Sequence, residues 1–280
     1  MDTQWVAYEP QIRLGFLFAV LFAMAAWEIA APRRRQKIGR AARWPSNLGI
    51  VVLNTVLVRL IFPASAMGIA VIADGRDWGL LNVFDVPPLV AFVVALVSLD
   101  VAIYLQHVLF HAVPVLWRLH RMHHADLEFD VTTGLRFHPF EILLSMGIKA
   151  GVIVALGAPA AAVLAFETLL SAASMFNHGN VRMPLGLDRV LRWIVVTPDM
   201  HRVHHSILPD ETNSNFGFSV SWWDRLFGTY RAQPSQGHDG MTIGIEQFRD
   251  AGELRLDRML IQPARGRAET YPINRRAKGG

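Results

Sequence analysis

Residues 87–124 read PPLVAFVVALVSLDVAIYLQHVLFHAVPVLWRLHRMHH, and this stretch decides the fold. Its first part, Pro87 to Phe110, is apolar except at a few positions such as Asp100. A helix needs about 20 apolar residues to cross the hydrocarbon core of a bilayer, and this run is long enough. Histidines 107 and 111 lie at its end, and histidines 120, 123 and 124 follow. The stretch therefore predicts a membrane helix that leads into a cluster of candidate metal ligands.

Three further apolar runs flank this stretch. Ile12 to Ala31 has acidic residues before it and three arginines soon after it, which favours a retained membrane anchor over a cleaved signal peptide. Leu48 to Ala73 is interrupted by Arg59 and a proline, so we expect either a kinked span or two half-helices. Ile142 to Phe176 contains Gly157-Ala158-Pro159, a typical turn sequence, and is expected to form a membrane hairpin.

The composition agrees with a membrane protein, and the charges indicate its orientation. Apolar residues make up 52% of the chain and charged residues 18%, whereas soluble domains contain about 25% charged residues. The basic residues concentrate in residues 32–46 and 264–280, and the remainder is acidic overall. Because the basic residues are confined to one loop and one tail, this pattern indicates the cytosolic side of a membrane and attraction to lipid, not binding to nucleic acid. We expect a loose polar tail after Pro263.

Histidines are the residues that point to chemistry. The chain has 11 histidines and no cysteine, which excludes disulfides, thiolate zinc sites and iron–sulfur clusters ligated by this chain. Spacings of three and four residues put imidazoles on one face of a helix, where they can converge on a metal. Ten histidines fall in one part of the chain: His107, His111, His120, His123, His124, His138, His178, His201, His204 and His205. The eleventh, His238, follows a glycine and is expected at the surface.

The number of imidazoles predicts more than one metal ion. One tetrahedral zinc ion takes four ligands, and imidazole also suits iron, copper and nickel, so we expect two metals of unassigned type from the spacing alone. The Glu-x-x-His pairs of soluble di-iron proteins and the His-Glu-x-x-His helix of zinc proteases are absent from the sequence. His138 precedes Pro139 and is either a ligand or a helix-start residue, whereas we expect His178 to be a ligand.

Residues outside the histidine motifs have less certain roles. Asp100 shares a helix face with Tyr104 and His107, so it is a candidate to hold a ligating imidazole through a hydrogen bond. The alternative is that Asp100 pairs with Arg59 on a neighbouring span. The tryptophans near the motifs are expected to anchor the protein at the membrane interface: Trp117, Trp222 and Trp223.

These motifs, over roughly residues 90–235, resemble those of the fatty acid hydroxylase/sterol desaturase superfamily of membrane-bound, histidine-rich di-iron enzymes, and in particular its bacterial members. The order is His-x-x-x-His, His-x-x-His-His, a His-Pro step, one histidine after a membrane hairpin, and a second His-x-x-His-His. The resemblance rests on the strings LHRMHH (119–124), GLRFHP (134–139), NHGN (177–180), TPDMHRVHH (197–205), ETNSNFG (211–217) and WDRLFGTY (223–230).

The resemblance implies a ligand set and two iron ions. The implied ligands are His107, His111, His120, His123, His124, His178, His201, His204 and His205. The fatty acid 2-hydroxylase branch has one more histidine, where this chain has Ser174. The tenth ligand is then His138, a water molecule or missing, and we include His138 in the predicted set. Asn215, Asp224 and Arg136 are candidates to orient the ligands or the substrate.

The resemblance also implies the reaction. The chain is expected to hydroxylate, or desaturate, a C–H bond of a sterol-like, fatty acyl or related membrane lipid with O2 as cosubstrate. No segment resembles a fused haem-binding electron donor, so electrons are expected from a separate protein, a ferredoxin or cytochrome served by an NAD(P)H reductase. The alternatives are a divalent-metal transporter and a non-catalytic relative that binds lipid. We expect a bacterial inner-membrane protein with a cytoplasmic active site.

Together, these features predict an all-α integral membrane protein with four to five membrane-embedded helices and a cytosolic helical cap that holds a histidine-rich dimetal site. We divide the chain into N-terminal membrane helices with a basic cytosolic loop (1–86), a fatty acid hydroxylase-like catalytic domain (87–235), and a C-terminal extension with a basic tail (236–280).

Overall fold

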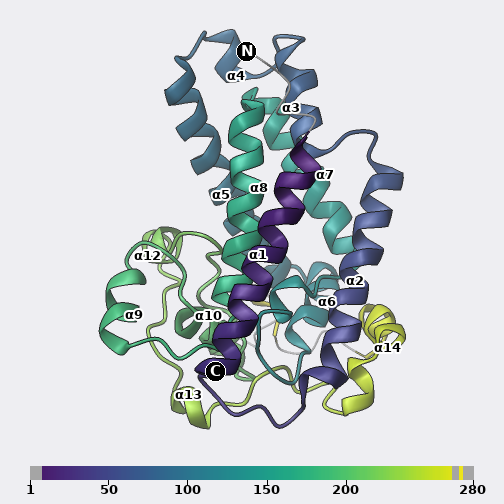
Figure 1. The fold of residues 1–280 in the computed structure, drawn as a ribbon, viewed down its shortest axis with the longest axis vertical. Coiled ribbons are helices and arrows are strands. Elements are labelled where there is room, and N and C mark those ends of the chain that lie inside the picture. The colour runs from purple at the N-terminus through teal and green to yellow at the C-terminus, as the bar shows by residue number, and fades with distance from the viewer. Residues whose placement is uncertain (1–7, 267–270, 274–280) are drawn as a thin grey trace, which may run out of the picture.

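The described part of the chain is helical, as predicted. The computed structural model describes residues 8–266 and 271–273. Within these residues no strand forms, and only isolated bridges pair extended segments. Five segments are long and apolar enough to cross a membrane: α1 (Glu9–Ala30), the segment Arg40–Asp74, α5 (Pro88–Ala112), α7 (Pro139–Leu156) and α8 (Ala160–Asn177). The chain is thus an all-α integral membrane protein (Figure 1).

The segment Arg40–Asp74 consists of two helices, which was the second of the two predicted alternatives. It contains α2 (Arg40–Ile61) and α3 (Ala66–Asp74). Pro63 lies in the break, where its ring would disrupt a continuous helix. Ser65 caps α3 by accepting a hydrogen bond from the backbone N–H of Gly68 at 3.1 Å. A short helix, α4 (Leu80–Val83), then leads into α5.

The predicted membrane hairpin is formed by α7 and α8. Gly157 ends α7 in the left-handed conformation, with φ of 68°, and Pro159 directly precedes α8. A Cβ atom on Gly157 would lie 2.5 Å from the carbonyl oxygen of Trp78. Only glycine tolerates both this φ and this close approach. The turn therefore packs directly against the segment before α4.

The long helices form a bundle with a small-residue and aliphatic core. α1 packs on α8, α5 packs on α7 and α8, and α3 packs on the α7–α8 hairpin. The core includes Leu99, Ile103, Met146, Ile153 and Phe166, all nearly inaccessible. Large apolar side chains such as Phe16, Phe22, Leu60 and Leu89 point outward instead. Outward-facing apolar residues are expected where a bundle contacts lipid.

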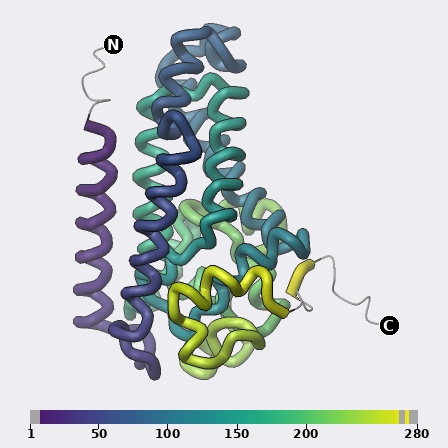
Figure 2. Tube along the Cα trace, turned by 90° about the vertical axis from the view of Figure 1, so that its right-hand side faces the viewer, coloured from purple at the N-terminus to yellow at the C-terminus, as the bar shows by residue number. Residues whose placement is uncertain are grey.

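A cap of short helices closes one end of the bundle, at the bottom in Figure 1. The cap comprises α6 (Pro114–His124), η2 (Thr133–Leu135), α9 (Leu185–Leu191), α10 (Pro198–His204), α11 (Pro209–Thr212), α12 (Trp222–Leu226), α13 (Gly237–Gly240), η3 (Ala251–Leu254), α14 (Leu256–Ile261) and η4 (Gln262–Ala264). In Figure 2, α1 stands at the edge of the bundle and its lower end reaches the cap. There Glu28 accepts hydrogen bonds from the backbone N–H groups of Val131, at 2.7 Å, and Asn180, at 2.8 Å.

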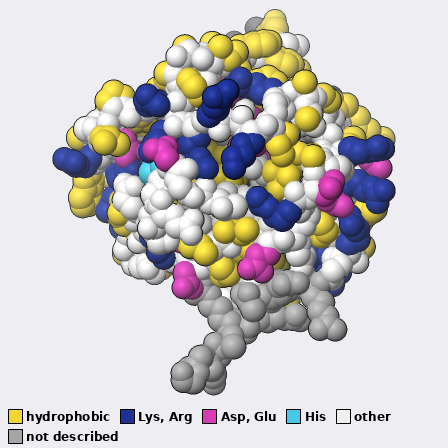
Figure 3. Space-filling view, turned by 90° about the horizontal axis from the view of Figure 1, so that it is seen from below, with side chains coloured by type: hydrophobic (Ala, Val, Ile, Leu, Met, Phe, Trp, Pro, Cys, Tyr) yellow, Lys and Arg dark blue, Asp and Glu magenta, His cyan; other side chains and the backbone are white. Residues whose placement is uncertain are grey.

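The basic loop between α1 and α2 lies against the cap, so the two are on the same side of the bundle. Arg33 pairs with Asp199 at 3.2 Å and with Asp239 at 2.9 Å. Arg43 is fully buried and contacts Asp126 at 2.7 Å and Asp130 at 2.5 Å. The expectation that the basic residues of segment 32–46 serve lipid attraction is therefore wrong for Arg43, which lies at the start of α2 and whose charge is neutralised inside the protein. On the face seen in Figure 3, Lys and Arg side chains are interspersed with Asp and Glu.

Part of the predicted loose tail is packed against the cap. Residues 267–270 and 274–280 lie outside the described residues, but Tyr271 is buried and its ring stacks on Trp117 at 5.4 Å. Its hydroxyl donates to the carbonyl oxygen of Ile207 at 2.8 Å. Trp117 is itself buried, so the prediction that it anchors the protein at the membrane interface is wrong. Trp222 is half exposed, as an interface residue would be.

Candidate metal centre

The end of α5 and the start of α6 place the first histidines. His107 and His111 lie one turn apart near the end of α5. Pro114, at the first position of α6, turns the chain after Val113. α6 therefore folds back on α5 and brings its three histidines, His120, His123 and His124, beside those of α5.

The remaining histidines come from α8 and α10. His178 directly follows α8 and is its C-terminal cap residue. α10 is a seven-residue helix that begins after Thr197, whose hydroxyl accepts a hydrogen bond from Met200 N at 3.3 Å. Its last turn and the residue after it carry His201, His204 and His205. Four separate segments thus deliver nine histidines to one place.

The nine histidines form two adjoining groups, each able to hold a metal ion. In each group the candidate ligand atoms lie within 4.8 Å of one another, and every member is buried. The first group is His107, His111, His120, His124 and His204, and the second is His123, His178, His201 and His205. The two groups adjoin. The consecutive residues His123 and His124 belong to different groups, and the rings of His124 and His205, one from each group, stack with their centroids 4.5 Å apart.

Hydrogen bonds at Nδ1 turn the Nε2 atoms inward. Six of the imidazoles have an oxygen acceptor at Nδ1: His107 at Phe216 O (2.7 Å), His120 at Glu141 Oε1 (2.6 Å), His204 at Ser214 O (2.7 Å), His178 at Ser174 O (2.7 Å), His123 at Arg136 O (3.2 Å) and His111 at Asn213 Oδ1 (3.1 Å). Because these acceptors require Nδ1–H, the proton lies on Nδ1 and Nε2 has a lone pair. Nδ1 of His124, His201 and His205 has no acceptor among the described residues.

The Nε2 atoms then face one another at distances that suit ligands of a common cation. His107 and His120 approach to 3.1 Å between Nε2 atoms, and so do His178 and His123. In both pairs each nitrogen presents a lone pair, so the contact is repulsive unless a cation lies between them. Imidazole nitrogens bind metals at about 2.0–2.1 Å, which puts two nitrogens on one ion about 3 Å apart. The donor set therefore fits metal ions.

Burial keeps the cap histidines neutral. Burial is the main cause that lowers the pKa of His123, His201 and His204 well below the usual value, and neighbouring imidazoles lower it further. His124 and His205 are shifted in the same way. Burial lowers the pKa of His178 to about 3. Neutral imidazoles at neutral pH are the form that binds metals.

Asn215 and Asp224 hold the loop that supplies two of the Nδ1 acceptors. Asp224 accepts hydrogen bonds from the backbone N–H groups of Phe216 at 2.7 Å and Gly217 at 2.9 Å. Burial raises the pKa of Asp224 to about 6, although these hydrogen bonds oppose the shift. Asn215 donates to the carbonyl oxygen of Met200 at 2.9 Å, which joins the loop to α10. The two predicted residues therefore orient His107 and His204 through the backbone.

The side chains of Asp100 and Arg136 bond to groups other than the imidazoles. Asp100 accepts a hydrogen bond from Trp223 Nε1 at 2.7 Å, so it joins α5 to the cap. Arg136 is buried, and its Nε donates to the carbonyl oxygen of Met122 at 2.9 Å. Burial lowers the pKa of Arg136 to about 10, which still leaves the guanidinium charged at neutral pH. Its own carbonyl oxygen is the acceptor for His123.

Two histidines lie outside both groups. Nδ1 of His138 accepts a hydrogen bond from Phe140 N, and Nε2 lies 3.2 Å from the carbonyl oxygen of Leu260, so His138 caps α7. The expectation that His238 is a surface residue is wrong: it is only 6% exposed. Its Nε2 lies 3.7 Å from Asp199, and burial lowers its pKa to about 4. Ser174, at the position of the missing histidine, donates to Gly134 O at 2.7 Å.

Glu141 is the residue of the site that the sequence interpretation missed. It is buried at the start of α7 and accepts the hydrogen bond from His120 Nδ1. A carboxylate that binds a ligating imidazole in this way fixes its ring and makes it a better ligand. The available signal was an acidic residue two positions after the His138-Pro139 step, just before an apolar run.

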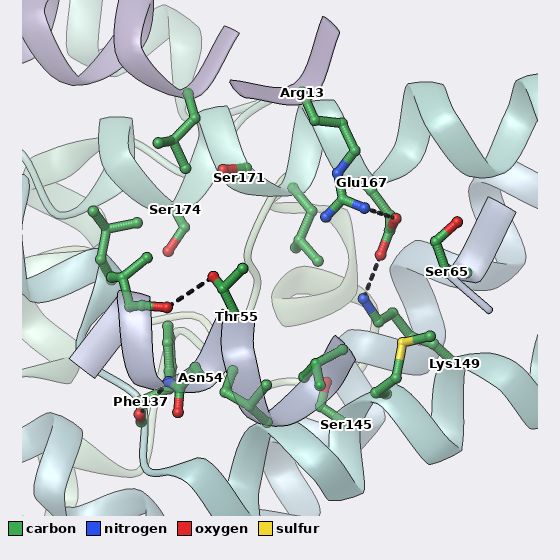
Figure 4. Close-up of a pocket in the computed structure, with 18 of the residues that line it drawn as sticks. Arg13, Asn54, Thr55, Ser65, Phe137, Ser145, Lys149, Glu167, Ser171 and Ser174 are labelled. Atoms are coloured by element: carbon green, nitrogen blue, oxygen red, sulfur yellow. Dashed lines mark hydrogen bonds and ion pairs between the residues drawn. The ribbon is translucent and has the colours of Figure 1, made fainter. Parts of the chain in front are cut away.

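A cavity of about 750 Å³ leads from the bundle to the first histidine group. It lies between α1, α2, α5, α7 and α8 (Figure 4). Its lining includes His107 and His120. Most of its wall is apolar, and Phe137, which stacks on His123 at 4.5 Å, lies at the histidine end. Protein cavities that bind small molecules have volumes of about 300–1,000 Å³, so this cavity is large enough for part of a lipid molecule.

The fold and site together define a membrane protein with a buried polyhistidine site for metal ions. Residues 92–229, just under half of the chain, match the family model described as fatty acid hydroxylase. This confirms the resemblance seen in the sequence. No solved structure matches the chain.

Curated relatives are named as lipid hydroxylases or monooxygenases. The chain is 33% identical to the ornithine lipid hydroxylase OlsE of Rhizobium tropici, over 51% of this chain and 42% of the relative. It is 28% identical to the human alkylglycerol monooxygenase, over 55% of this chain and 34% of the relative. It is 25% identical to the rat cholesterol 25-hydroxylase, over 57% and 52% respectively. The chain thus spans only about a third to a half of these relatives.

Proposed function

We propose that the chain is a membrane-bound non-haem di-iron oxygenase that hydroxylates, or desaturates, a C–H bond of a lipid with O2 and externally supplied electrons. One observation carries the proposal: nine buried imidazoles, most with Nε2 turned inward by a hydrogen bond at Nδ1, converge at the end of a cavity that opens within the membrane bundle. The hydroxylase and monooxygenase names of the relatives support it.

Nine of the ten predicted histidines make up the proposed ligand set. Five and four ligands suit two ions better than one, because a single ion does not use nine imidazoles. His138 is left out of the proposed set, since both of its ring nitrogens have local backbone contacts. When bound, a pair of iron ions supplies the one-electron chemistry by which O2 is activated for attack on a C–H bond.

The chain contributes position and exclusion of water. Glu141 and the carbonyl oxygens of Phe216 and Ser214 keep their imidazoles in the tautomer that presents Nε2. Phe137 and Phe218 stack or tilt against the histidine rings and cover the site from the cavity side. An alkyl chain in the cavity would therefore lie beside His107 and His120 in a dry surrounding.

The orientation of the protein follows from the basic loop. Arg33 and Arg34 contact cap residues, so the loop and the site lie at the same end of the bundle. Positive segments that flank membrane helices remain in the cytoplasm. We therefore place the cap in the cytoplasm of a bacterial cell, where a separate ferredoxin or cytochrome with an NAD(P)H reductase can deliver electrons.

The test is purification under anaerobic conditions, followed by metal analysis and measurement of O2 use with a reductase, a ferredoxin and membrane lipid extract. We expect iron as the main metal, and O2 use that depends on lipid. His204→Ala should abolish both iron retention and O2 use, while the exposed control Asp257→Asn should change neither. A folded protein that holds no iron and oxidises no lipid would refute the proposal.

A further inference from the structure

The cavity contains charged residues in the middle of the bundle, far from the histidines. Glu167 on α8 contacts Lys149 on α7 at 2.7 Å and Arg13 on α1 at 2.9 Å, and Arg13 also contacts Glu9 at 2.8 Å. We call these four residues the intramembrane ion network. Figure 4 shows Arg13, Glu167 and Lys149 joined on one side of the cavity, with Asn54 and Phe137 on the other.

Two members of the network, Lys149 and Glu167, lie near the middle of α7 and α8, whereas Glu9 and Arg13 belong to the first turns of α1. Lys149 is ten residues after Pro139 and seven before the end of α7, and Glu167 is seven residues after the start of α8 and ten before its end. With a rise of about 1.5 Å per residue, both lie about 15 Å above the cap ends of these helices. Ionisable residues at such a depth are costly, face a cavity or a partner, and mark functional positions.

The network faces the cavity and is not simply packed between helices. All four of its residues line the cavity wall, and the Arg13 side chain is 40% exposed. The stability of the fold alone does not explain these buried ion pairs, because apolar residues of similar size at the same positions often give the same or greater stability. The charges therefore point to a polar group of a ligand.

Charge balance and distance restrict the ligand. The cationic residues that line the cavity are Arg13, Arg59 and Lys149, and the acidic ones are Glu9, Glu141 and Glu167, so the formal charges cancel. A cancelled charge favours an uncharged group over a carboxylate or phosphate. Lys149 lies eight residues after Glu141, which binds the ligating His120, so the polar group and the histidine end are about 12 Å apart along α7.

We propose that the intramembrane ion network binds an uncharged lipid group that both donates and accepts a hydrogen bond, namely a hydroxyl. The carboxylate of Glu167 accepts from this hydroxyl, and Lys149 or Arg13 donates to it. This contact fixes how far the lipid enters and so determines which carbon lies beside His107 and His120. The role of this contact in placing a carbon beside the histidines rests on the proposed function, but binding of the hydroxyl can be measured without catalytic turnover.

The test measures binding of three radiolabelled probes to the full chain in nanodiscs, each corrected for partition into protein-free nanodiscs. We expect 1-hexadecanol to bind about tenfold more tightly than hexadecane, because only the alcohol can form hydrogen bonds with the charged groups. Palmitate should bind more weakly than 1-hexadecanol. Equal binding of the alcohol and the alkane, or tighter binding of palmitate, would overturn the proposal without any variant.

A double variant separates ligand binding from a structural role. Lys149→Met with Glu167→Met removes one charge of each sign and leaves Arg13 with Glu9, so no charge is left unpaired. We expect the alcohol-to-alkane ratio to fall to about one, while Ser145→Ala, one helical turn from Lys149 in the same cavity, keeps the native ratio. A folded double variant that keeps the native ratio would show a purely structural network. If the wild-type protein binds the alcohol more tightly than the alkane as expected but oxidises no lipid, the result counts against the proposed function and not against the proposed binding.

Discussion

Individual residues around the metal centre act mainly by setting the direction of an imidazole. Glu141, Asn213 and the backbone carbonyl oxygens of Phe216 and Ser214 accept hydrogen bonds from Nδ1–H groups, so Nε2 is presented to the interior. The acceptors differ in charge: His120 has a carboxylate, whereas most of the others have neutral oxygens. Hydrogen bonds to a charged acceptor are the stronger ones, so Glu141 should matter most among them.

Removal of the Glu141 carboxylate should weaken metal binding. We expect Glu141→Ala to lower the affinity for iron, measured by competition with a chelator, by about 10–100-fold, as is typical for residues that hold a metal ligand. Glu141→Gln should restore part of this loss, because its amide oxygen can still accept the proton of His120. Equal iron affinity in all three proteins would contradict the role assigned to Glu141.

His138 should act as a helix cap and not as a ligand. It accepts a hydrogen bond from the backbone of Phe140, and loss of an N-terminal cap typically costs about 1 kcal/mol of stability. We therefore expect His138→Ala to lower the midpoint of thermal unfolding by a few degrees and to retain its iron. Loss of iron as complete as in His204→Ala would instead make His138 the tenth ligand.

At the scale of helices and loops, buried charges and one tight turn fix the relative positions of the elements. Arg43 on α2 binds Asp126 and Asp130 in the segment between α6 and η2, and it thereby joins the membrane bundle to the cap. Gly157 brings the α7–α8 turn against the segment before α4. Neither contact involves a histidine side chain, so its loss should lower stability before it changes chemistry.

The ion pair of Asp130 should give stability that depends on pH. Burial alone would raise the pKa of Asp130, but Arg43 outweighs it and the pKa lies below its usual value. A carboxylate with a lowered folded pKa stabilises the protein above the unfolded pKa of about 3.9, and this stability is lost as the pH falls through the folded pKa.

We therefore expect Asp130→Asn to lower the unfolding temperature at pH 7 by several degrees, and the difference from wild type to shrink below about pH 4. The exposed pair of Asp257 with Arg255 offers a control, since Asp257→Asn should change little. A difference that grows on acidification would contradict this assignment.

Substitution of Gly157 should destabilise the hairpin. Gly157→Ala adds a Cβ at a positive φ and 2.5 Å from the carbonyl oxygen of Trp78, so the unfolding temperature should fall clearly. Gly151→Ala is a matched control in the same helix, because nothing lies within 4 Å of its Cβ position. Similar unfolding temperatures for the two variants would argue against the tight turn.

Much of the fold could be predicted from the sequence because its determinants are local. The apolar runs around α1, α5 and the α7–α8 hairpin are long enough to identify by length and composition, and Gly157-Ala158-Pro159 marks the turn. The histidine motifs likewise identify the site, since their spacing is itself the signal.

The features that could not be predicted depend on contacts between distant segments. The sequence suggests that Trp117 is an interface residue and that His238 is exposed. In the structure, Tyr271 packs on Trp117 and other cap residues bury His238. Arg43 resembles the other basic loop residues, although two aspartates far along the chain bury it. The separation of His123 and His124 into different groups also needs the orientation of α6.

The whole molecule combines a lipid-facing bundle with a polar cap, and the metal centre lies where they meet. The cavity lies among the membrane helices and ends at the histidines, so the proposed lipid substrate would reach the site from within the bundle. The basic loop and the cap lie at the same end of the bundle. This arrangement suits an enzyme that takes a substrate from the membrane and electrons from the cytosol.

The proposed orientation can be tested by thiol labelling, because the natural chain has no cysteine. Arg76→Cys lies before α4 at the end opposite the cap, and Gln233→Cys lies on the cap, both at exposed positions. In intact spheroplasts a membrane-impermeant maleimide should label Arg76→Cys and not Gln233→Cys, while lysis should expose both. The reverse pattern would place the cap outside the cytoplasm.

The most direct test of the central claim is the origin of oxygen in the product. The iron-loaded protein, with a reductase and ferredoxin, is supplied with membrane lipid extract and O2 labelled with oxygen-18, and the lipids are analysed by mass spectrometry. We predict a lipid that carries one oxygen-18 atom, or one that has lost two hydrogens, in wild type and in Asp257→Asn but not in His204→Ala. Unchanged lipids with iron-loaded wild type, or the same products with His204→Ala, would contradict the account.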